Sequence, residues 1–271
     1  MVCAVSGGAD SLALMALAVA ASLNVTAVHV DHRIRPDSNS ESTRVEHAAR
    51  ALGAAFQAVT ADVGPGPNLE ARARSARYAA LPPDVLTGHT ADDVAETVIL
   101  NLLRGAGLDG LSGMRAVGGP SGRVRHPLLG IRRSDTERLC SFLGWEPLQD
   151  PSNLDPSILR NRVRREILPQ LGLAAGRDLV PILCRQAALM ADEADILDTL
   201  SEAIDPTDAR QLAAAPVALA RRAIRRWLTG EHPPDAATVE RVLAVARGEA
   251  VACEIPGGRR VTRSHQRLTR H

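Results

Sequence analysis

The sequence predicts an α/β fold, a doubly wound parallel sheet followed by a smaller, mainly helical domain. Three observations predict it. Short apolar runs alternate with amphipathic helical patterns through the first half of the chain, which is typical of parallel sheets covered by helices on both faces. A glycine-rich turn joins the first apolar run to the first helical pattern. From Leu173 the chain is rich in Ala and Arg and keeps a helical pattern almost to its end.

The strands and helices of the first domain follow one another in regular order. Strands are expected at residues 2–5, 25–30, 55–59 and 85–87, and helices begin near Asp10, Ser40, Leu69 and Thr90. In a Rossmann-like sheet of this kind, ligands bind at the carboxyl ends of the parallel strands. Because Ser6, Asp31 and Gly88 each follow a strand, we expect three distant stretches of chain to meet in one crevice.

After Gly105 the pattern loosens into loops rich in Gly and Pro. The run from Ser134 to Glu137 is then typical of a capping box, and it predicts a helix that extends to about Leu143. A basic helix is expected from Ser157 to Leu168, and Pro169 would end it.

The domain boundary is placed at this proline. Residues 1–168 form the expected domain with the parallel sheet, and residues 169–271 form the small helical domain. Within the second domain, the segment from Glu254 to Leu268 predicts a short terminal β-hairpin around Pro256-Gly257-Gly258.

The composition is that of a soluble globular protein, with 45% hydrophobic and 23% charged residues among 271. No apolar run is long enough to span a bilayer and no leader precedes the first strand, so we expect a cytoplasmic chain without a membrane partner. The four cysteines are widely spaced and form no CxxC pair, which argues against a zinc site, an iron–sulfur cluster or a disulfide framework. All 32 positive charges are arginines, because the sequence contains no lysine.

The glycine-rich turn Ser6-Gly7-Gly8-Ala9-Asp10-Ser11 has a chemical meaning. Two consecutive glycines let the backbone adopt positive φ and approach a ligand closely, while the free N–H groups of the following helix favour an anion. Ser6 and Ser11 add hydroxyl donors, and Asp10 can hold Mg²⁺ or cap the helix. A Walker A loop is excluded, because it needs a Lys before Ser or Thr. The alternative is an ordinary turn between strand and helix, with Asp10 as the cap.

Polar residues also follow the second expected strand. Asp31 stands where this strand ends, and His32, Arg33 and Arg35 come shortly after it. We expect this group to face the ligand side of the sheet, because the carboxyl ends of neighbouring parallel strands lie at the same edge. The alternative is a solvated loop.

The helix expected from Thr90 carries three carboxylates on one polar face, those of Asp92, Asp93 and Glu96. Like charges this close raise one another's pKa unless a cation lies among them, which favours Mg²⁺ or a cationic substrate group. In the alternative interpretation, Thr90 and Asp93 form a capping box and the acidic residues suit the helix dipole. That interpretation does not explain Glu96, or His89 just before the helix, equally well.

The basic helix beginning near residue 157 carries arginines at short spacings. They wrap most of the helix, so a face that binds phosphate is available. The alternative is a solvated basic helix with no ligand.

Together these segments resemble the tRNA(Ile)-lysidine synthetase family of PP-loop ATP pyrophosphatases. The resemblance covers most of the first two-thirds of the chain. The sequence departs from the family at two points: Arg33 stands where the family usually has Gly, and the helix that usually precedes the first strand is not in this sequence. The matching motifs are SGGADS (6–11), VDHRIR (30–35), NLEARARSARYAAL (68–81), TGHTADDVAETVILNLLRGAGLDGLSGM (87–114), DPSN (150–153) and RNRVRREILPQL (160–171).

The resemblance implies a reaction and its substrates. ATP would adenylate the C2 carbonyl oxygen of the wobble cytidine in the isoleucine tRNA with a CAU anticodon, and free L-lysine would then attack C2 to give lysidine, AMP and pyrophosphate. ATP and Mg²⁺ are the implied cofactors, and a homodimer is one assembly to be considered. Two rival functions stay open: a PP-loop tRNA-modifying enzyme of the 2-thiolation type, and a non-catalytic, nucleotide-dependent RNA-binding protein.

The resemblance also implies roles for individual residues. The ATP phosphates would lie on Ser6, Gly7, Gly8, Ala9, Asp10 and Ser11. The catalytic residues would be Asp31, His89, Asp93, Glu96 and Arg104, and metal contacts would come from Asp10 and Asp92. The tRNA would be bound by Arg160, Asn161, Arg162 and Arg165, together with the second domain.

Overall fold

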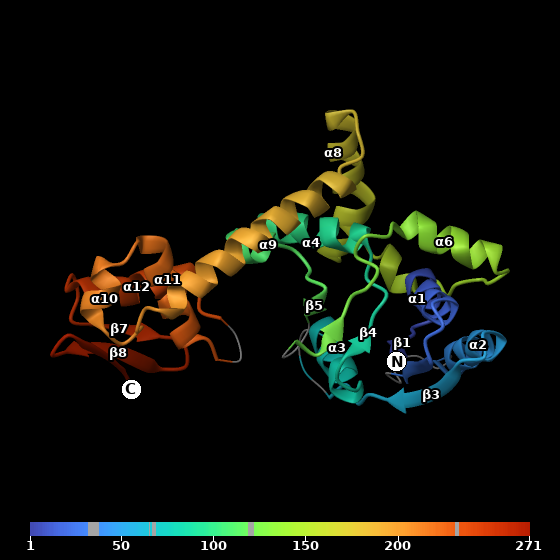
Figure 1. The fold of residues 1–271 in the computed structure, drawn as a ribbon, viewed down its shortest axis with the longest axis horizontal. Coiled ribbons are helices and arrows are strands. Elements are labelled where there is room, and N and C mark those ends of the chain that lie inside the picture. Colours follow the sequence, from blue (N-terminus) through green and yellow to red (C-terminus); the bar gives the residue numbers. More distant parts are fainter. Residues whose placement is uncertain (32–37, 65, 67–68, 119–121, 231–232) are drawn as a thin grey trace. The chain divides into compact units, whose positions relative to one another are not determined.

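The computed structural model describes residues 1–31, 38–64, 66, 69–118, 122–230 and 233–271. It divides into two compact units, Met1–Leu189 and Met190–His271 (Figure 1). The division falls within the long helix α9 (Val180–Glu202). The functional boundary expected at residues 168 and 169 stays a prediction.

The larger unit is built on a six-stranded sheet with the order β3-β2-β1-β4-β6-β5. Its strands are β1 (Val2–Ala4), β2 (Thr26–Asp31), β3 (Ala55–Thr60), β4 (Val85–Leu86), β5 (Val117–Gly118) and β6 (Val124–Arg125). All pairs are parallel except β5 with β6, which is antiparallel at the edge. The predicted fold class is therefore confirmed, and the short antiparallel edge is an addition that the sequence pattern did not predict.

Helices cover both faces of this sheet. They are α1 (Ala9–Ala20), α2 (Ser38–Ala51), α3 (Leu69–Ala80), α4 (Ala91–Leu103), α5 (Leu108–Leu111) and α6 (Arg133–Phe142), with the 3₁₀ turn η2 (Pro151–Leu154) after them. One core cluster packs Cys3 and Ala27 of the sheet against Met15 of α1. A second cluster packs Val28 on the other face against Tyr78 of α3. The two clusters show that α1 and α3 lie on opposite faces of the sheet.

Helix α6 begins earlier than its sequence predicts. The expected cap was Ser134, but the helix starts at Arg133, with Arg132 as the capping residue and Asp135 in the third helical position. The reason is a tertiary contact: the backbone N–H of Arg133 donates to Asp92 Oδ2 at 2.8 Å. Because this acceptor comes from α4, no pattern around residue 134 could reveal it.

The basic segment after residue 157 is longer than expected. It consists of α7 (Leu159–Arg162), a π-helical turn η3 (Val163–Ile167) and α8 (Leu168–Ala175). Pro169 lies in the first turn of α8, where a missing N–H costs little. The expectation that Pro169 ends the helix is therefore wrong, and the end comes at Gly176, which has a φ of 65°.

The smaller unit packs helices on a three-stranded antiparallel sheet. Its elements after α9 are α10 (Ala209–Ala214), α11 (Val217–Leu228), α12 (Ala236–Arg247), β7 (Ala252–Ile255), β8 (Arg259–Ser264) and β9 (Arg267–Arg270). The expected hairpin is present as β7 and β8. Strand β9 was not predicted, because its two-residue turn has φ of 47° at His265 and 63° at Gln266, a conformation that Gly and Asn usually provide.

Within the described part of the chain, no single helix is long and apolar enough to cross a membrane, and one pair of helical segments that meet at 97° passes that test only when taken together.

Candidate active site

The glycine-rich turn forms a hydrogen-bonded loop at the start of α1. Gly7 has a φ of 88°, and a Cβ at this position would overlap the side chain of Leu148. Ser11 Oγ accepts the backbone N–H of Ser6 at 3.1 Å and donates to the carbonyl of Gly8 at 2.9 Å. Gly8 is the N-cap, and no side chain caps the helix. The first N–H groups of α1 are thus offered to an anion, and Asp10 is not the cap.

The loop after β4 touches this turn. A Cβ on Gly88 would lie 2.5 Å from the carbonyl oxygen of Asp10 and 2.9 Å from the backbone nitrogen of Ser11. The two backbones therefore meet with no room for a side chain, and the expected convergence of these two strand ends is observed. Asp31 closes β2, which pairs with β1. His32, Arg33 and Arg35 lie outside the described residues.

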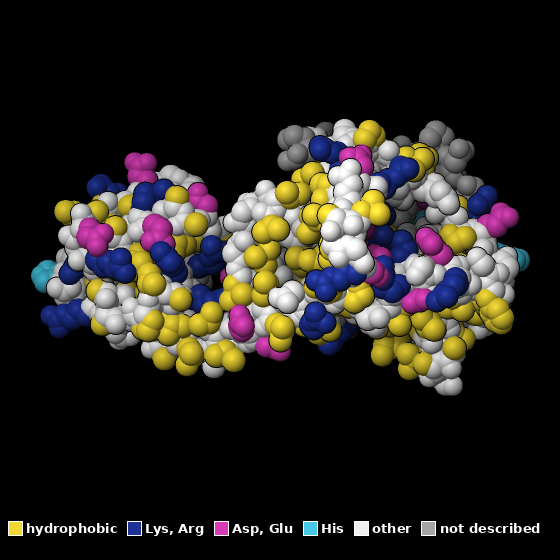
Figure 2. All heavy atoms as spheres, turned by 90° about the horizontal axis from the view of Figure 1, so that it is seen from above, with side chains coloured by type: hydrophobic (Ala, Val, Ile, Leu, Met, Phe, Trp, Pro, Cys, Tyr) yellow, Lys and Arg dark blue, Asp and Glu magenta, His cyan; other side chains and the backbone are white. Residues whose placement is uncertain are grey.

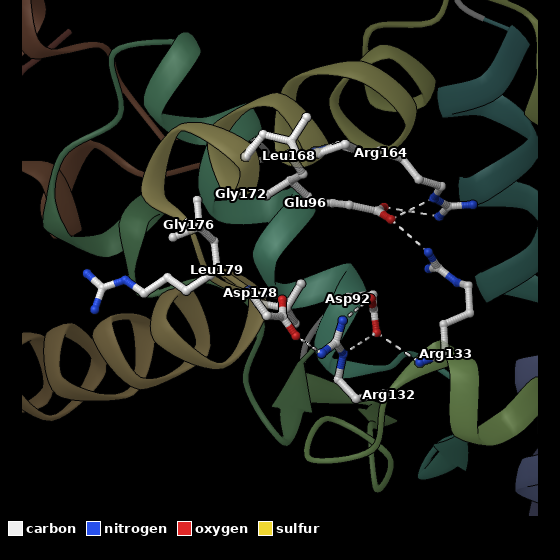
Figure 3. Close-up of a pocket in the computed structure, with 14 residues that line it drawn as sticks. Asp92, Glu96, Arg132, Arg133, Arg164, Leu168, Gly172, Gly176, Asp178 and Leu179 are labelled. Atoms are coloured by element: carbon white, nitrogen blue, oxygen red, sulfur yellow. Dashed lines mark hydrogen bonds and ion pairs between the residues drawn. The ribbon is translucent and has the colours of Figure 1, made fainter.

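Glu96 is the most enclosed charged group of the site. Its side chain is 1% exposed, and its carboxylate accepts hydrogen bonds from three arginines. Arg133 Nη1 lies 3.0 Å from Oε1 and Arg160 Nε lies 2.9 Å from Oε2. Arg164 binds both oxygens, with Nε at 2.6 Å from Oε1 and Nη2 at 3.0 Å from Oε2. Figure 3 shows Arg133 and Arg164 pointing at this carboxylate.

Asp93 shares these arginines and also caps its helix. Its Oδ1 lies 3.1 Å from Arg133 Nη2 and 3.0 Å from Arg160 Nη2. Its Oδ2 accepts the backbone N–H of Thr90 at 2.9 Å, so the capping box is present. Burial opposes the charge of Asp93, but Arg133, the Thr90 N–H and Arg160 outweigh it and lower its pKa. The capping box is therefore confirmed, and the catalytic role of Asp93 stays a prediction.

Asp10 and Asp92 accept hydrogen bonds from residues at the start of α6. Asp10 accepts from Arg133 Nε at 3.3 Å and from the hydroxyl of Thr136. Asp92 accepts from Arg132 Nε and Nη2, both at 3.1 Å, and Arg132 also pairs with Asp178 (Figure 3).

The cations that face the acidic residues are thus arginines. Within the described residues, no three of His, Cys, Asp and Glu converge in a way that could hold a metal ion. On the face drawn in Figure 2, basic and acidic side chains of the larger unit lie intermingled rather than in separate patches of one sign. We call the group of Asp10, Asp93, Glu96, Arg133, Arg160 and Arg164 the arginine cage.

His89 belongs to a separate polar group that follows the ends of β4 and β6. Its Nδ1 lies 2.8 Å from Thr87 Oγ1 and 3.1 Å from Nδ1 of His126. Burial lowers the pKa of His89 to about 3, and burial also lowers the pKa of His126. Both imidazoles are therefore neutral at physiological pH and can bind a nucleobase or sugar through hydrogen bonds.

A groove of about 640 Å³ opens beside the cage. Its charged lining includes Glu96, Arg133 and Arg164 (Figure 3). Its apolar lining includes Leu168 and Leu173 of α8. The groove can hold a small molecule that carries both charges and an aliphatic chain.

Comparison with known proteins places the chain in a family. Residues 1–171 match the model of the PP-loop domain, and residues 208–269 match the TilS substrate binding domain. The tRNA(Ile)-lysidine synthase of Nocardia farcinica is 42% identical over 98% of this chain and 90% of its own length. The chain belongs to the tRNA(Ile)-lysidine synthase family. Relatives of the same name from Rhodococcus erythropolis (44% identical, 84% of this chain, 73% of the relative) and Mycolicibacterium paratuberculosis (40%, 94% and 85%) agree.

A solved structure supports the fold independently. The U34-tRNA thiolase NcsA from Methanococcus maripaludis, with its [4Fe-4S] cluster, is similar with a TM-score of 0.53 and 16% identity, over 70% of this chain and 72% of that chain. This similarity concerns the fold alone. The four cysteines of the present chain are free, and burial raises the pKa of Cys3 and Cys140 to about 11. These two thiols therefore lack the reactivity that the rival thiolation chemistry needs.

The residues predicted to bind tRNA lie in different environments. Arg162 and Arg165 are exposed, whereas Arg160 is in the cage. Asn161 is buried, and its amide donates to the carbonyl of Asp155 at 2.8 Å. Arg104 is exposed at the C-terminal end of α4; eight residues of helix put it about 12 Å along the axis from Glu96, outside the cage.

Sequence reasoning gave no site role to three residues that the structure brings to the site: Arg133 and Thr136 come from α6, and His126 follows β6. Arg164 of η3 was expected only as one arginine of a basic, phosphate-binding helix, and the structure places it on Glu96. One signal was present for Arg133: Arg132 and Arg133 stand at the start of a helix, where positive charge opposes the helix dipole. Such a pair needs acidic partners elsewhere in the fold.

The pKa of Asp10 yields a prediction about stability. Burial raises this pKa, Thr136 and Arg133 lower it, and the net direction is upward. A carboxyl group with a raised folded pKa destabilises the native state as pH rises from the unfolded value of 3.8 through the folded pKa, and stays unfavourable above it. We expect Asp10→Asn to raise the melting temperature at pH 8 and lower the rate of tRNA adenylation. A melting temperature at or below that of the wild type would contradict this assignment.

Proposed function

We propose that this chain is an ATP-dependent ligase that joins free L-lysine to C2 of the wobble cytidine in the isoleucine tRNA with a CAU anticodon. The C2 oxygen attacks the α-phosphate of ATP and pyrophosphate leaves. An amine of lysine then attacks C2, AMP leaves with that oxygen, and the amine loses a proton. The observation that carries this proposal is the uncapped glycine loop that meets Gly88 and lies beside the arginine cage.

The loop supports binding of the ATP phosphates. Its backbone N–H groups and the hydroxyls of Ser6 and Ser11 are donors for phosphate oxygens. No lysine is available in this sequence to neutralise the phosphates. The guanidinium group of Arg133 binds Asp10 of this loop. We therefore assign to Arg133 the role of neutralising the negative charge on the departing pyrophosphate.

Mg²⁺ fits at Asp10 better than at Asp92. Mg²⁺ keeps several waters and needs only one or two carboxylates besides phosphate oxygens, and Asp10 lies in the phosphate loop. Asp92 accepts three hydrogen bonds, from Arg132 Nε and Nη2 and from the N–H of Arg133, whereas Asp10 accepts two, from Arg133 and Thr136. When bound, Mg²⁺ would neutralise phosphate charge as pyrophosphate departs.

The groove beside the cage suits the amino-acid substrate. The aliphatic stem of lysine can pack on Leu168 and Leu173, while Asp178 can accept from an ammonium group. Arg177 in the same lining can bind the carboxylate of lysine. A homodimer stays a prediction that a measurement of mass in solution would test.

The function is tested by incubation with ATP, labelled lysine and tRNA. We expect label in an isoleucine CAU transcript and none in a methionine CAU transcript, which has the same anticodon on a different tRNA body. Label in neither transcript, with folded protein, would overturn the proposal. Sulfur transfer in place of lysine transfer would favour the thiolation alternative.

The exposed arginines Arg162 and Arg165 give a further prediction. Replacing either with Ala should weaken tRNA binding and reduce the slope of log K against log salt by about one, because each change removes one phosphate contact. Fluorescence anisotropy over a salt series measures both quantities. Arg138→Ala is the control, since Arg138 is 80% exposed on α6 and pairs with Asp135 three residues away on the same helix. Slopes equal to the wild type in both variants would contradict a role in tRNA binding.

A further inference from the structure

The starts of three helices meet at one arginine outside the cage. Asp92 lies in the first turn of α4, Arg132 is the N-cap of α6, and Asp178 lies two residues before α9. Arg132 Nε and Nη2 each lie 3.1 Å from one oxygen of Asp92, and Nη1 donates to Asp178 Oδ2. All three residues belong to the larger unit, and Figure 3 shows the guanidinium group between the two carboxylates. We call these three residues the Arg132 bridge.

Helix α6 by itself does not explain an arginine at this position. The N-cap favours Ser, Thr, Asp or Asn, and a positive charge at a helix start opposes the helix dipole. Stability does not explain it either, because the side chain of Arg132 is 32% exposed and an ion pair open to solvent contributes little to folding. The bridge is explained better by the place that it occupies.

That place is the wall of the groove beside the cage. Asp92, Arg132 and Asp178 all line the groove of about 640 Å³. Asp178 Oδ1 also accepts the backbone N–H of Val180 at 3.0 Å, so the position of Asp178 is tied to the first turn of α9. Leu179 and Val180 line the groove as well. Arg132 therefore determines how far the α9 side of the groove lies from its α4 side.

Only an arginine can make both ends of this bridge. A guanidinium group presents five N–H donors in a planar fork, so it can bind both oxygens of one carboxylate and still donate to a second. A lysine ammonium has the same charge, but its three donors are on one nitrogen atom. Arg132→Lys would therefore keep the charge of residue 132 and lose the connection between Asp92 and Asp178.

We propose that Arg132 is a positioning residue for the amino-acid substrate, which acts through Asp178 by holding the α9 side of the groove in place. The proposal rests on the proposed function, because that function places free lysine in this groove. The cage does not depend on Arg132 in the same way. The N–H of Arg133 donates directly to Asp92, and the guanidinium group of Arg133 is held by Asp10 and Glu96.

The test is the kinetics of Arg132→Lys at saturating ATP and tRNA. We expect the KM for lysine to rise about tenfold and kcat to change by less than about twofold, because the lost contacts position the substrate and do not stabilise the transition state. The Kd for ATP and the melting temperature should stay unchanged. Arg125→Lys is the matched control. Arg125 binds Asp84 through Nε at 3.0 Å and Nη2 at 2.8 Å, and this pair is not among the described residues that line the groove.

Asp178→Asn tests the route by which Arg132 acts. Asparagine keeps an oxygen for the N–H of Val180 but removes the charge that Arg132 binds. If Arg132 acts through Asp178, the double variant raises the KM for lysine no more than the larger of the two single changes. Effects that multiply in the double variant would overturn the proposal. So would an unchanged KM in Arg132→Lys, an equal rise in the control, or a loss confined to kcat.

Calorimetry with L-lysine, in the presence of ATP and without tRNA, gives a readout that needs no turnover. We expect Arg132→Lys to weaken lysine binding by the same factor as it raises the KM. Unchanged lysine affinity in this variant refutes the role of Arg132 alone. Weakened lysine binding by the variant, together with no lysine transfer to tRNA by the wild type, refutes the proposed function alone. A wild-type protein that binds no lysine would overturn both.

Discussion

Glu96→Ala is expected to abolish lysine transfer and to destabilise the larger unit by about 3 kcal/mol or more. The carboxylate is 1% exposed and accepts from three arginines. Its removal leaves Arg133, Arg160 and Arg164 facing one another with one fewer counter-charge, and breaking a buried ion pair from one side costs much more than the pair contributes. Chemical denaturation measures the loss of stability, and the labelled-lysine assay measures the loss of activity.

Glu96→Gln and Glu137→Ala make this result interpretable. Glutamine keeps one acceptor oxygen for the guanidinium groups but removes the charge, so we expect a smaller loss of stability and still a large loss of activity. Glu137 is exposed on α6, and its replacement should change neither quantity appreciably. If Glu96→Ala were as stable as the wild type, the cage would not hold the three arginines as described.

Gly88→Ala should lower the rate of tRNA adenylation by about 100-fold, because a shift of about 1 Å in a catalytic site can cost that much. The new Cβ would lie 2.5 Å from the carbonyl oxygen of Asp10, and backbone atoms on both sides cannot rotate away. The start of α1, with its N–H groups and Asp10, must therefore move. Single-turnover assays measure the rate of the chemical step, and calorimetry measures the affinity of the loop for ATP.

Gly130→Ala is the matched control for this change. Nothing lies within 4 Å of a Cβ at Gly130, and its φ is outside the left-handed region. We expect full activity in that variant. An active Gly88→Ala enzyme with normal ATP affinity would show that the contact between the two loops does not determine the geometry of the phosphate site.

The parts of the site that arise from one continuous segment could be predicted from the sequence. The strand, turn and helix around Gly7 and Gly8 follow from local periodicity and glycine content, and the capping box of Thr90 and Asp93 follows from spacing. The convergence of Ser6 and Gly88 follows from the rule for parallel sheets, because both come after strand ends.

The arginine cage could not be predicted in the same way. Its carboxylates come from α1 and α4, and its guanidinium groups come from α6, α7 and η3. Periodicity shows which residues share a helix face, but it does not show which distant helix supplies the opposite charge. For this reason the cation among Asp93 and Glu96 was expected to be Mg²⁺ or a substrate, and in the structure it is arginine.

Fold details were missed for related reasons. Strands β5 and β6 have two residues each, which is too short for an alternation to be visible. Strand β9 follows a turn at His265 and Gln266 that lacks the residues typical of its conformation. Pro169 was interpreted as a helix end, but the preceding π-helical turn places it in the first turn of a new helix.

We propose that this chain replaces the C2 oxygen of the wobble cytidine by lysine, with ATP cleaved to AMP and pyrophosphate. The most direct measurement is mass spectrometry of nucleosides from the isoleucine CAU tRNA after incubation with the protein, ATP and lysine. We expect one cytidine whose mass has increased by one lysine less one water, and no such product without ATP. Unmodified cytidine in the presence of folded protein, ATP and lysine would contradict it.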